Sequence, residues 1–197
     1  MSDTGLYKGK YRTESTRLKE WDYSSFGYYF VTICTKNREC VFGEIADGKM
    51  ELSKIGEMVM QYWLEIPRQF HNVKLDEFVI MPNHVHGIVI IEKRNDKDAT
   101  NCRDGINAVS TDRQNPMLSE RSLFKIIRWF KGRCTYEINR MLKIRFSWQS
   151  RFHDHVIRDE ESLRKIREYI RNNPLKWDFD EDNPTVFLKK KKNHHDT

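Results

Sequence analysis

A stretch with two histidines constrains the fold of this 197-residue chain more than any other. Residues 81–91 (Met-Pro-Asn-His-Val-His-Gly-Ile-Val-Ile-Ile) end in a run of β-branched residues, which predicts a β-strand. Side chains alternate between the two faces of a strand, so His84 and His86 should point the same way, with Val85 between them. Two imidazoles on one strand face can hold a divalent metal ion, although a hydrogen-bonded pair on a half-buried strand is the simpler explanation of a bare His-x-His.

The composition is typical of a globular protein with one core, with 38% hydrophobic and 32% charged residues. No apolar run is long enough to span a bilayer and the first residues are polar, so we expect a cytoplasmic protein without a membrane partner. The four cysteines lack Cys-x-x-Cys spacing, which favours free thiols. A net charge of +6 and 12% aromatic residues favour a polyanionic partner such as single-stranded nucleic acid, although core packing and surface solvation explain most of these residues one at a time.

Hydrophobic periodicity and turn residues predict the other elements. The first half should contain a strand at 28–35, a small hairpin around Asp47-Gly48, a helix from Ser53 to about Phe70 that Pro67 ends or bends, and a strand at 74–81 that pairs with the histidine strand. The second half should contain a long helix from Ser119 or Ser122 to about Leu142, a strand-like segment at 146–158 and a last helix from Asp159 to Asn173. Composition predicts a basic flexible arm at 1–25, one domain at 26–178 with a flexible insertion at 93–118, and a basic tail at 179–197.

The last predicted helix carries Tyr169 and Asn173 at positions i and i+4, on one face. If this helix packs on the strand of His84 and His86, three potential metal ligands and one phenol converge. A metal ion held by two imidazoles and one amide oxygen keeps open positions for a phosphate oxygen of DNA. The Tyr169 oxygen could then attack the phosphorus and form a phosphotyrosine. Taken singly, Tyr169 fits a packing role and Asn173 fits the end of a helix before proline.

Several motifs occur together, in a fixed order. They are 29–35, 78–84, His-Val-His at 84–86, Trp-Gln at 148–149, Phe-His-Asp-His-Val-Ile at 152–157 and Tyr-Ile-Arg-Asn-Asn-Pro-Leu-Lys-Trp at 169–177. From about residue 26 to 178 the chain thus resembles the REP-associated tyrosine transposases. This family belongs to the single-tyrosine HUH transposases that act on single-stranded DNA.

The resemblance implies an α+β fold, a ferredoxin-like antiparallel β-sheet with helices packed on it. It implies a divalent metal ion, Mg²⁺ or Mn²⁺, with His84 and His86 as ligands, Asn173 as the third ligand and Tyr169 as the nucleophile; no residue is assigned to an organic cofactor. The implied activity is metal-dependent cleavage and rejoining of single-stranded DNA next to hairpins, by a nucleoid-associated protein. Both a homodimer and a monomer are compatible with it. Related enzymes carry glutamine at the third-ligand position, so the shorter Asn173 requires a closer approach of its helix.

Five further residues are candidates for nucleic-acid contact: Trp148, Gln149, His155, Arg128 and Lys131. Arg128 and Lys131 can share one side of the long helix and contact a phosphate backbone, or form an ordinary solvated face. Trp148 could stack on a base. His155 fits a phosphate contact, or a second metal site with His153.

Two other functional classes remain open. The first is a hairpin nucleic-acid-binding protein without cleavage activity. The second is a zinc hydrolase built on His84, His86 and a third histidine among His71, His153 and His155, although the chain has no His-Glu-x-x-His helix.

Overall fold

A four-stranded antiparallel sheet forms the centre of the computed structural model, which describes residues 22–93 and 122–186. Its strands, in sheet order, are β4 (Val73–Ile80), β5 (His84–Ile91), β1 (Gly27–Cys34) and β6 (His153–Ile157). In chain order they alternate with α1 (Lys54–Leu64) and α3 (Leu123–Leu142) as β1-α1-β4-β5-α3-β6. This order and pairing define the ferredoxin-like arrangement, so the α+β fold class predicted from the sequence is confirmed.

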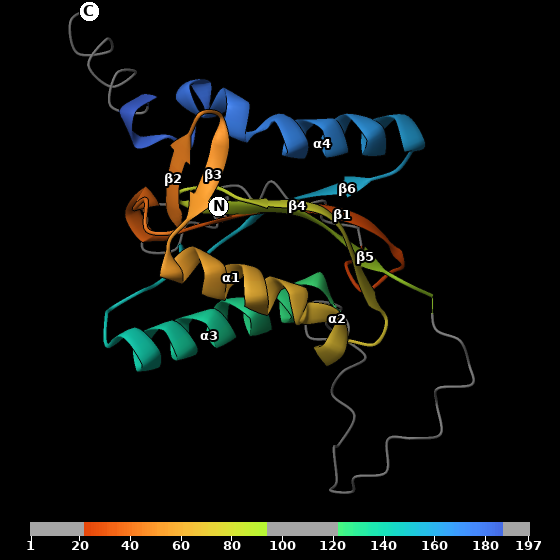
Figure 1. Ribbon diagram of the computed structural model, residues 1–197. Helices are drawn as coiled ribbons and strands as arrows, with labels where there is room; N and C mark the ends of the chain where they lie inside the picture. The colour runs from red at the N-terminus through yellow and green to blue at the C-terminus, as the bar shows by residue number, and fades with distance from the viewer. Residues whose placement is uncertain (1–21, 94–121, 187–197) are drawn as a thin grey trace, which may run out of the picture.

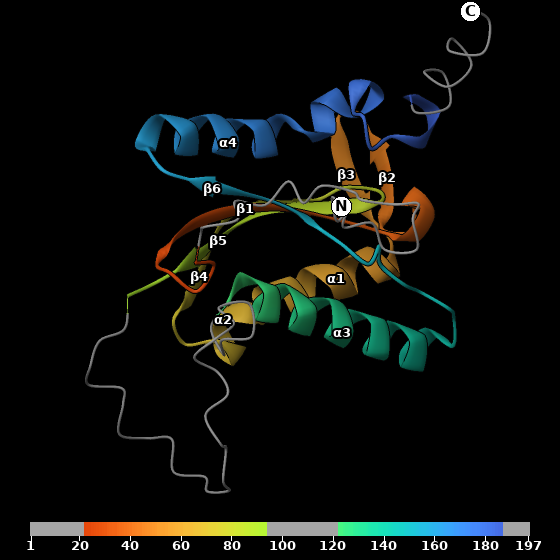
Figure 2. The ribbon, with the colours of Figure 1, turned by 180° about the vertical axis from the view of Figure 1, so that it is seen from behind.

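The helices form one layer on each side of the sheet (Figure 1). Helices α1, α2 (Ile66–Gln69) and α3 cover one face, and α4 (Glu160–Asn172) lies across the other, as the reverse view also shows (Figure 2). A short 3-10 segment, η4 (Pro174–Phe179), follows α4 and contacts the small hairpin of β2 (Gly43–Ala46) and β3 (Lys49–Leu52). None of the helices in the described parts of the chain is long and apolar enough to cross a membrane.

Local sequence signals account for most element boundaries. The N-caps of α1, α3 and α4 are Ser53, Ser122 and Asp159, each accepting a backbone N–H three residues on. The hairpin turn is Asp47-Gly48, both at positive φ (49° and 70°), as a two-residue turn of this kind requires. These predictions are confirmed.

The helix predicted from Ser53 to about Phe70, with an end or bend at Pro67, is divided into two helices, because α1 ends at Leu64 and α2 starts at Ile66. Pro67, in the first turn of α2, cannot donate the N–H that would continue α1, and its ring would clash with the preceding turn. The break lies two residues before the proline.

The main core lies between the sheet and the pair α1 and α3. Trp63 is fully buried there and packs against Phe78 and Phe130, with ring centroids 6.1 and 5.2 Å away. Gly87 of β5 faces this ring, because a Cβ at Gly87 would lie 2.3 Å from a Trp63 ring carbon. The glycine after the second histidine therefore makes room for the core tryptophan.

The core on the other face of the sheet is smaller, and ion pairs supplement it. Ile88, Ile157, Leu163 and Ile170 form its buried part. Beside it, Arg167 of α4 binds Asp76 of β4 through both carboxylate oxygens, with nitrogen–oxygen distances of 2.6 to 3.2 Å.

A second ion pair lies one helical turn further along α4, between Arg171 and Glu77. Successive strand residues normally point to opposite faces, but the pairing of β4 with β5 shifts between Leu75 and Phe78. This irregularity lets Asp76 and Glu77 both face α4. The two ion pairs thus fix the rotation and height of α4 over the sheet.

The boundaries predicted for the arm and the tail include residues that pack on the domain. Tyr23 is buried in the main core, and the segment 181–182 contacts Arg38 and Asn83, at the ends of the two central strands. The rest of the predicted arm and tail, and nearly all of the predicted insertion at 93–118, lie outside the described residues.

Candidate metal and tyrosine site

Two histidine side chains of β5 form the centre of the candidate site, as the strand alternation predicts. His84 and His86 are 0% and 3% exposed on the face of the sheet that α4 covers. Their Nε2 atoms are 3.0 Å apart. Both rings therefore direct a ligand-type nitrogen towards one point.

Hydrogen bonds at the other ring nitrogen orient each histidine. Asn83 Nδ2 donates to two backbone oxygens, those of Arg38 (3.0 Å) and Asp182 (2.7 Å). Its Oδ1 therefore accepts from Nδ1 of His84 at 2.8 Å, which leaves the Nε2 lone pair of His84 available. Thr32 Oγ1 lies 2.9 Å from Nδ1 of His86 and can accept in the same way. Such outer contacts are typical of metal-binding histidines.

Burial also keeps these imidazoles neutral. Because a charged ring is poorly solvated at this depth, the pKa of His84 lies well below its usual 6.5. The same cause lowers the pKa of His86 to about 3, with a smaller contribution from His153. Neutral imidazole is the form that binds a metal ion.

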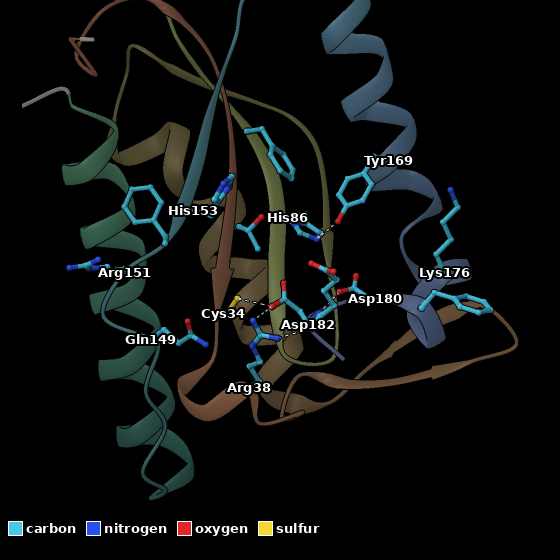
Figure 3. Close-up of a pocket in the computed structure, with 15 residues that line it drawn as sticks. Cys34, Arg38, His86, Gln149, Arg151, His153, Tyr169, Lys176, Asp180 and Asp182 are labelled. Carbon is cyan, nitrogen blue, oxygen red and sulfur yellow. Dashed lines mark hydrogen bonds and ion pairs between the residues drawn. The ribbon is translucent and has the colours of Figure 1, made fainter. Parts of the chain in front are cut away.

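The candidate nucleophile, Tyr169, lies next to this histidine pair. Tyr169 of α4 places its hydroxyl oxygen 3.2 Å from Nε2 of His86 (Figure 3). The Phe30 ring packs against both, with centroids 5.4 Å from His86 and 6.1 Å from Tyr169. The Tyr169 side chain remains 44% exposed, so a large substrate can reach it.

The pKa of Tyr169 is raised to about 12, first by burial and then by the charge of Asp180. A hydrogen bond from the side chain of Asn173 has the opposite effect and lowers this pKa. The phenol is therefore protonated at neutral pH in the protein alone, and positive charge brought beside it would ease its ionisation.

Two oxygen donors could complete a metal site: the Asp180 carboxylate beside the histidines, and the side-chain amide of Asn173, which hydrogen-bonds to Tyr169. Ligand atoms of His84, His86 and Asp180 all lie within 4.8 Å of one another, and no other such group of His, Cys, Asp and Glu occurs among the described residues. Asn173, the third ligand expected from the sequence, is 2% exposed, and its buried Oδ1 has no hydrogen-bond partner. Two neutral imidazoles, a carboxylate and an unsatisfied amide oxygen suit a divalent ion such as Mg²⁺ or Mn²⁺.

Asp180 was not predicted, because the sequence assigned residues 179–197 to a basic tail. The acidic run at 178–182, directly after the motif that contains Tyr169, was the available signal. The run is held at the site by Arg38, which binds the Asp182 carboxylate at 3.0 Å and the Glu181 carbonyl oxygen at 2.6 Å.

The site opens into a cleft of about 740 Å³ that runs from α4 towards the start of β6 (Figure 3). Tyr169 and Lys176 line one side, and Gln149, Arg151 and His153 line the other. Cys34 also lines it, but burial and the nearby Asp182 raise the pKa of this thiol to about 12. The thiol therefore stays protonated and is a poor metal ligand.

The other sequence-predicted contact residues are divided between the cleft and the core. Gln149 lines the cleft, and His155 is exposed on β6. Trp148 is only 8% exposed, and its ring packs against Phe42, Phe130 and Phe146. This burial favours a packing role for Trp148 over the stacking on a base suggested by the sequence.

Arg128 and Lys131 lie on α3, across the sheet from Tyr169. Arg128 is exposed, whereas the Lys131 ammonium donates to the backbone oxygens of Gln149 (2.5 Å) and Ser150 (3.2 Å). Among the described residues, no group of three or more potential metal ligands includes His153 or His155.

Comparison with known proteins places this site in a recognisable fold. The structure of a REP-associated tyrosine transposase bound to a REP hairpin superposes with a TM-score of 0.55, covering 84% of this chain and 74% of that one. The sequence identity is 18%, so the likeness establishes a shared fold.

At the level of sequence, no protein-family model matches the chain. A protein of Haemophilus influenzae, described as an uncharacterized protein, is 41% identical over 174 residues, which are 88% of this chain and 94% of that protein. The chain belongs to the same family as this Haemophilus influenzae protein.

Proposed function

We propose that the protein is a metal-dependent transposase or endonuclease that cleaves and rejoins single-stranded DNA next to hairpins through a 5′-phosphotyrosine intermediate. The observation that carries the proposal is the contact of the Tyr169 hydroxyl with His86, whose Nε2 in turn lies 3.0 Å from that of His84. The shared fold with a transposase described as bound to a REP hairpin supports hairpin DNA as the substrate class.

In the proposed reaction Tyr169 Oη forms a bond to the phosphorus of a DNA phosphodiester as the phenol loses its proton. The bond from phosphorus to the 3′ oxygen breaks, and that oxygen takes up a proton to become a hydroxyl. A divalent ion held by His84, His86, Asp180 and Asn173 would supply positive charge beside the phosphate. Because a phenolate is a better leaving group than an alkoxide, a 3′ hydroxyl of another strand can attack the phosphotyrosine and release Tyr169.

A covalent-adduct assay tests this proposal. Labelled hairpin DNA with single-stranded flanks is incubated with the full-length protein and Mn²⁺, or with a chelator, and the products are separated on a denaturing gel. We expect a shifted protein–DNA band that requires Mn²⁺. If DNA is bound but no hairpin yields an adduct, the protein is instead the hairpin-binding protein without cleavage activity. The raised pKa of Tyr169, caused first by burial and then by the charge of Asp180, is the observation that favours this alternative.

The zinc-hydrolase alternative needs a third histidine at the site. Among the described residues, the group of potential ligands around His84 and His86 contains Asp180 and no further histidine. The mixed set of two imidazoles and two oxygen donors thus favours a Mg²⁺ or Mn²⁺ enzyme over a hydrolase built on three histidines.

The metal site makes its own prediction. We expect Asp180→Ala and Asn173→Ala each to weaken Mn²⁺ binding by about tenfold or more, because each removes an oxygen donor from a pair of neutral histidines. Isothermal titration calorimetry of the purified protein measures the affinity. Asp178→Ala, at an exposed position in the same acidic run, is the matched control and should bind as the wild type does. Wild-type affinity in the Asp180 variant would remove Asp180 from the ligand set.

A further inference from the structure

We propose that a groove on the α3 side of the molecule binds the single-stranded DNA that leaves the catalytic cleft. The inference rests on the proposed function, and it names a second surface for the same substrate. The groove measures about 950 Å³ and lies between α3 and the segment 147–152 that leads into β6. Its centre is distinct from the cleft of Tyr169, which lies beside α4 (Figure 3).

The charges of the two depressions differ. The α3 groove is lined by Arg128, Lys131 and Arg151 and by no carboxylate. The catalytic cleft, by contrast, is lined by the acidic run at 180–182, which offsets its three cations Arg38, Arg151 and Lys176. A DNA strand is therefore attracted more strongly to the groove than to the cleft that carries the chemistry.

The groove and the cleft adjoin each other. Gln149, Arg151 and Phe152 line both of them. Figure 3 shows Gln149 and Arg151 on the α3 side of the cleft, across from Tyr169. A strand held with one phosphate at Tyr169 can thus pass over these residues and continue into the groove without crossing the body of the protein.

Backbone contacts hold this shared rim in place. The N–H of Gln149 donates to the carbonyl oxygen of Cys34 at 2.9 Å, and that of Lys36 donates to the carbonyl oxygen of Ser147 at 3.0 Å. On the other side, the Lys131 ammonium binds the carbonyl oxygens of the rim. The groove is therefore preformed, which lowers the entropic cost of binding a flexible strand.

The groove also offers rings and open space. Tyr136 on α3 is 63% exposed, and Phe152 is half-buried at the rim, so bases can stack on them while phosphates meet the cations. At Gly132, which lines the groove, no heavy atom lies within 4 Å of an added Cβ. A side chain placed there would project into the groove and disturb no packed neighbour.

Gly132 therefore provides a sharp test. Gly132→Glu puts a negative charge and added bulk into the groove, whereas Gly132→Ala adds only a methyl group; both replacements favour the helix over glycine. Met141→Glu, on the same helix at a 55% exposed position outside the groove, controls for the change in net charge. Binding to hairpin DNA with and without a single-stranded flank is measured by fluorescence anisotropy over a range of salt concentrations.

We expect Gly132→Glu to weaken binding of the flanked hairpin roughly tenfold and to lower the slope of log affinity against log salt by roughly 0.7 to 1. Gly132→Ala and Met141→Glu should bind nearly as the wild type does. At saturating DNA, Gly132→Glu should still form the adduct, because Tyr169 and the histidines are untouched.

The possible failures are distinguishable. If Gly132→Glu binds flanked DNA like the wild type, or if Met141→Glu is weakened equally, the groove is not the binding surface. A third outcome is that the wild type binds flanked DNA and Gly132→Glu binds it more weakly, but neither protein forms an adduct. The groove is then confirmed as a binding surface, and the proposed cleavage activity is wrong. If the wild type does not bind single-stranded DNA, both proposals are wrong.

Discussion

Replacing Tyr169 by phenylalanine is expected to abolish the covalent protein–DNA adduct while DNA binding and folding are retained. The substitution removes only the hydroxyl oxygen that lies 3.2 Å from His86 and leaves the ring against Phe30. Because no other atom of the side chain can form the phosphoester bond, the adduct should fall below detection. The free energy of unfolding should change by less than about 1 kcal/mol, because Tyr169 is partly exposed and its ring packing is preserved.

Tyr28→Phe is the matched control, because Tyr28 packs on the same face of the sheet and loses the same hydroxyl. This variant should form the adduct at the wild-type rate. The assay of the wild type, Tyr169→Phe and Tyr28→Phe under identical conditions separates loss of the nucleophile from a general loss of the site. An adduct that persists in Tyr169→Phe would assign the nucleophile to another residue.

The position of Tyr169 also depends on residues far from the chemistry. The ion pairs of Arg167 with Asp76 and of Arg171 with Glu77 anchor α4 beside the irregular part of β4. The apolar contact between α4 and the sheet is small and would not by itself fix the orientation of the helix. The two ion pairs help to orient α4 on the sheet. The sequence contains all four residues, yet nothing in its periodicity indicates that two neighbouring strand residues face the same helix.

The parts of the site that could be predicted from the sequence are those that depend on the local periodicity of a strand or a helix. The alternation of β5 places His84 and His86 on one face, and the spacing of α4 places Tyr169 and Asn173 together. Which face of the sheet α4 covers depends on tertiary packing and cannot be read from a local pattern. The resemblance to a known family implied that α4 packs on the face of the histidines, and the contact between Tyr169 and His86 agrees with this arrangement.

Asp180 shows where prediction from sequence ends. It follows η4, a 3-10 segment without a hydrophobic repeat, and it precedes a lysine-rich stretch that suggested a tail. Its place at the site is set by long-range contacts: Asn83 and Arg38 hold the backbone and side chain of Asp182. Arg38 itself lies in a turn with φ of 58°, which no sequence pattern indicated. Trp148 illustrates the same limit, because an aromatic residue among basic ones can face either the core or a ligand.

The buried histidine pair should make the metal-free protein sensitive to mild acid. In the folded state the pKa values of His84 and His86 are lowered, whereas in the unfolded chain both rings take up protons near pH 6.5. The unfolded state thus binds more protons below this pH, so stability is complete above pH 6.5 and falls as the pH drops towards the folded-state pKa values, about 3 for His86. Each histidine should lower the free energy of unfolding by about 1.4 kcal/mol per pH unit in this range.

Urea unfolding in the presence of a chelator, at intervals between pH 7.5 and 4.5, measures this slope. Asp76 does not contribute in this pH range, because its pKa is lowered from 3.8 and it affects stability only below that pH. Asp182 has a raised pKa, so its protonation in the folded state stabilises the protein towards pH 4.5 and partly offsets the loss caused by the histidines. His84→Gln should have a shallower slope than the wild type, and His155→Gln, at an exposed position, should keep it. Mn²⁺ should stabilise the wild type by a similar amount at pH 7.5 and pH 5, because the folded-state imidazoles stay neutral in this window and protons do not compete for their nitrogens. A flat profile in chelator would show that the two imidazoles are not held neutral in the folded protein.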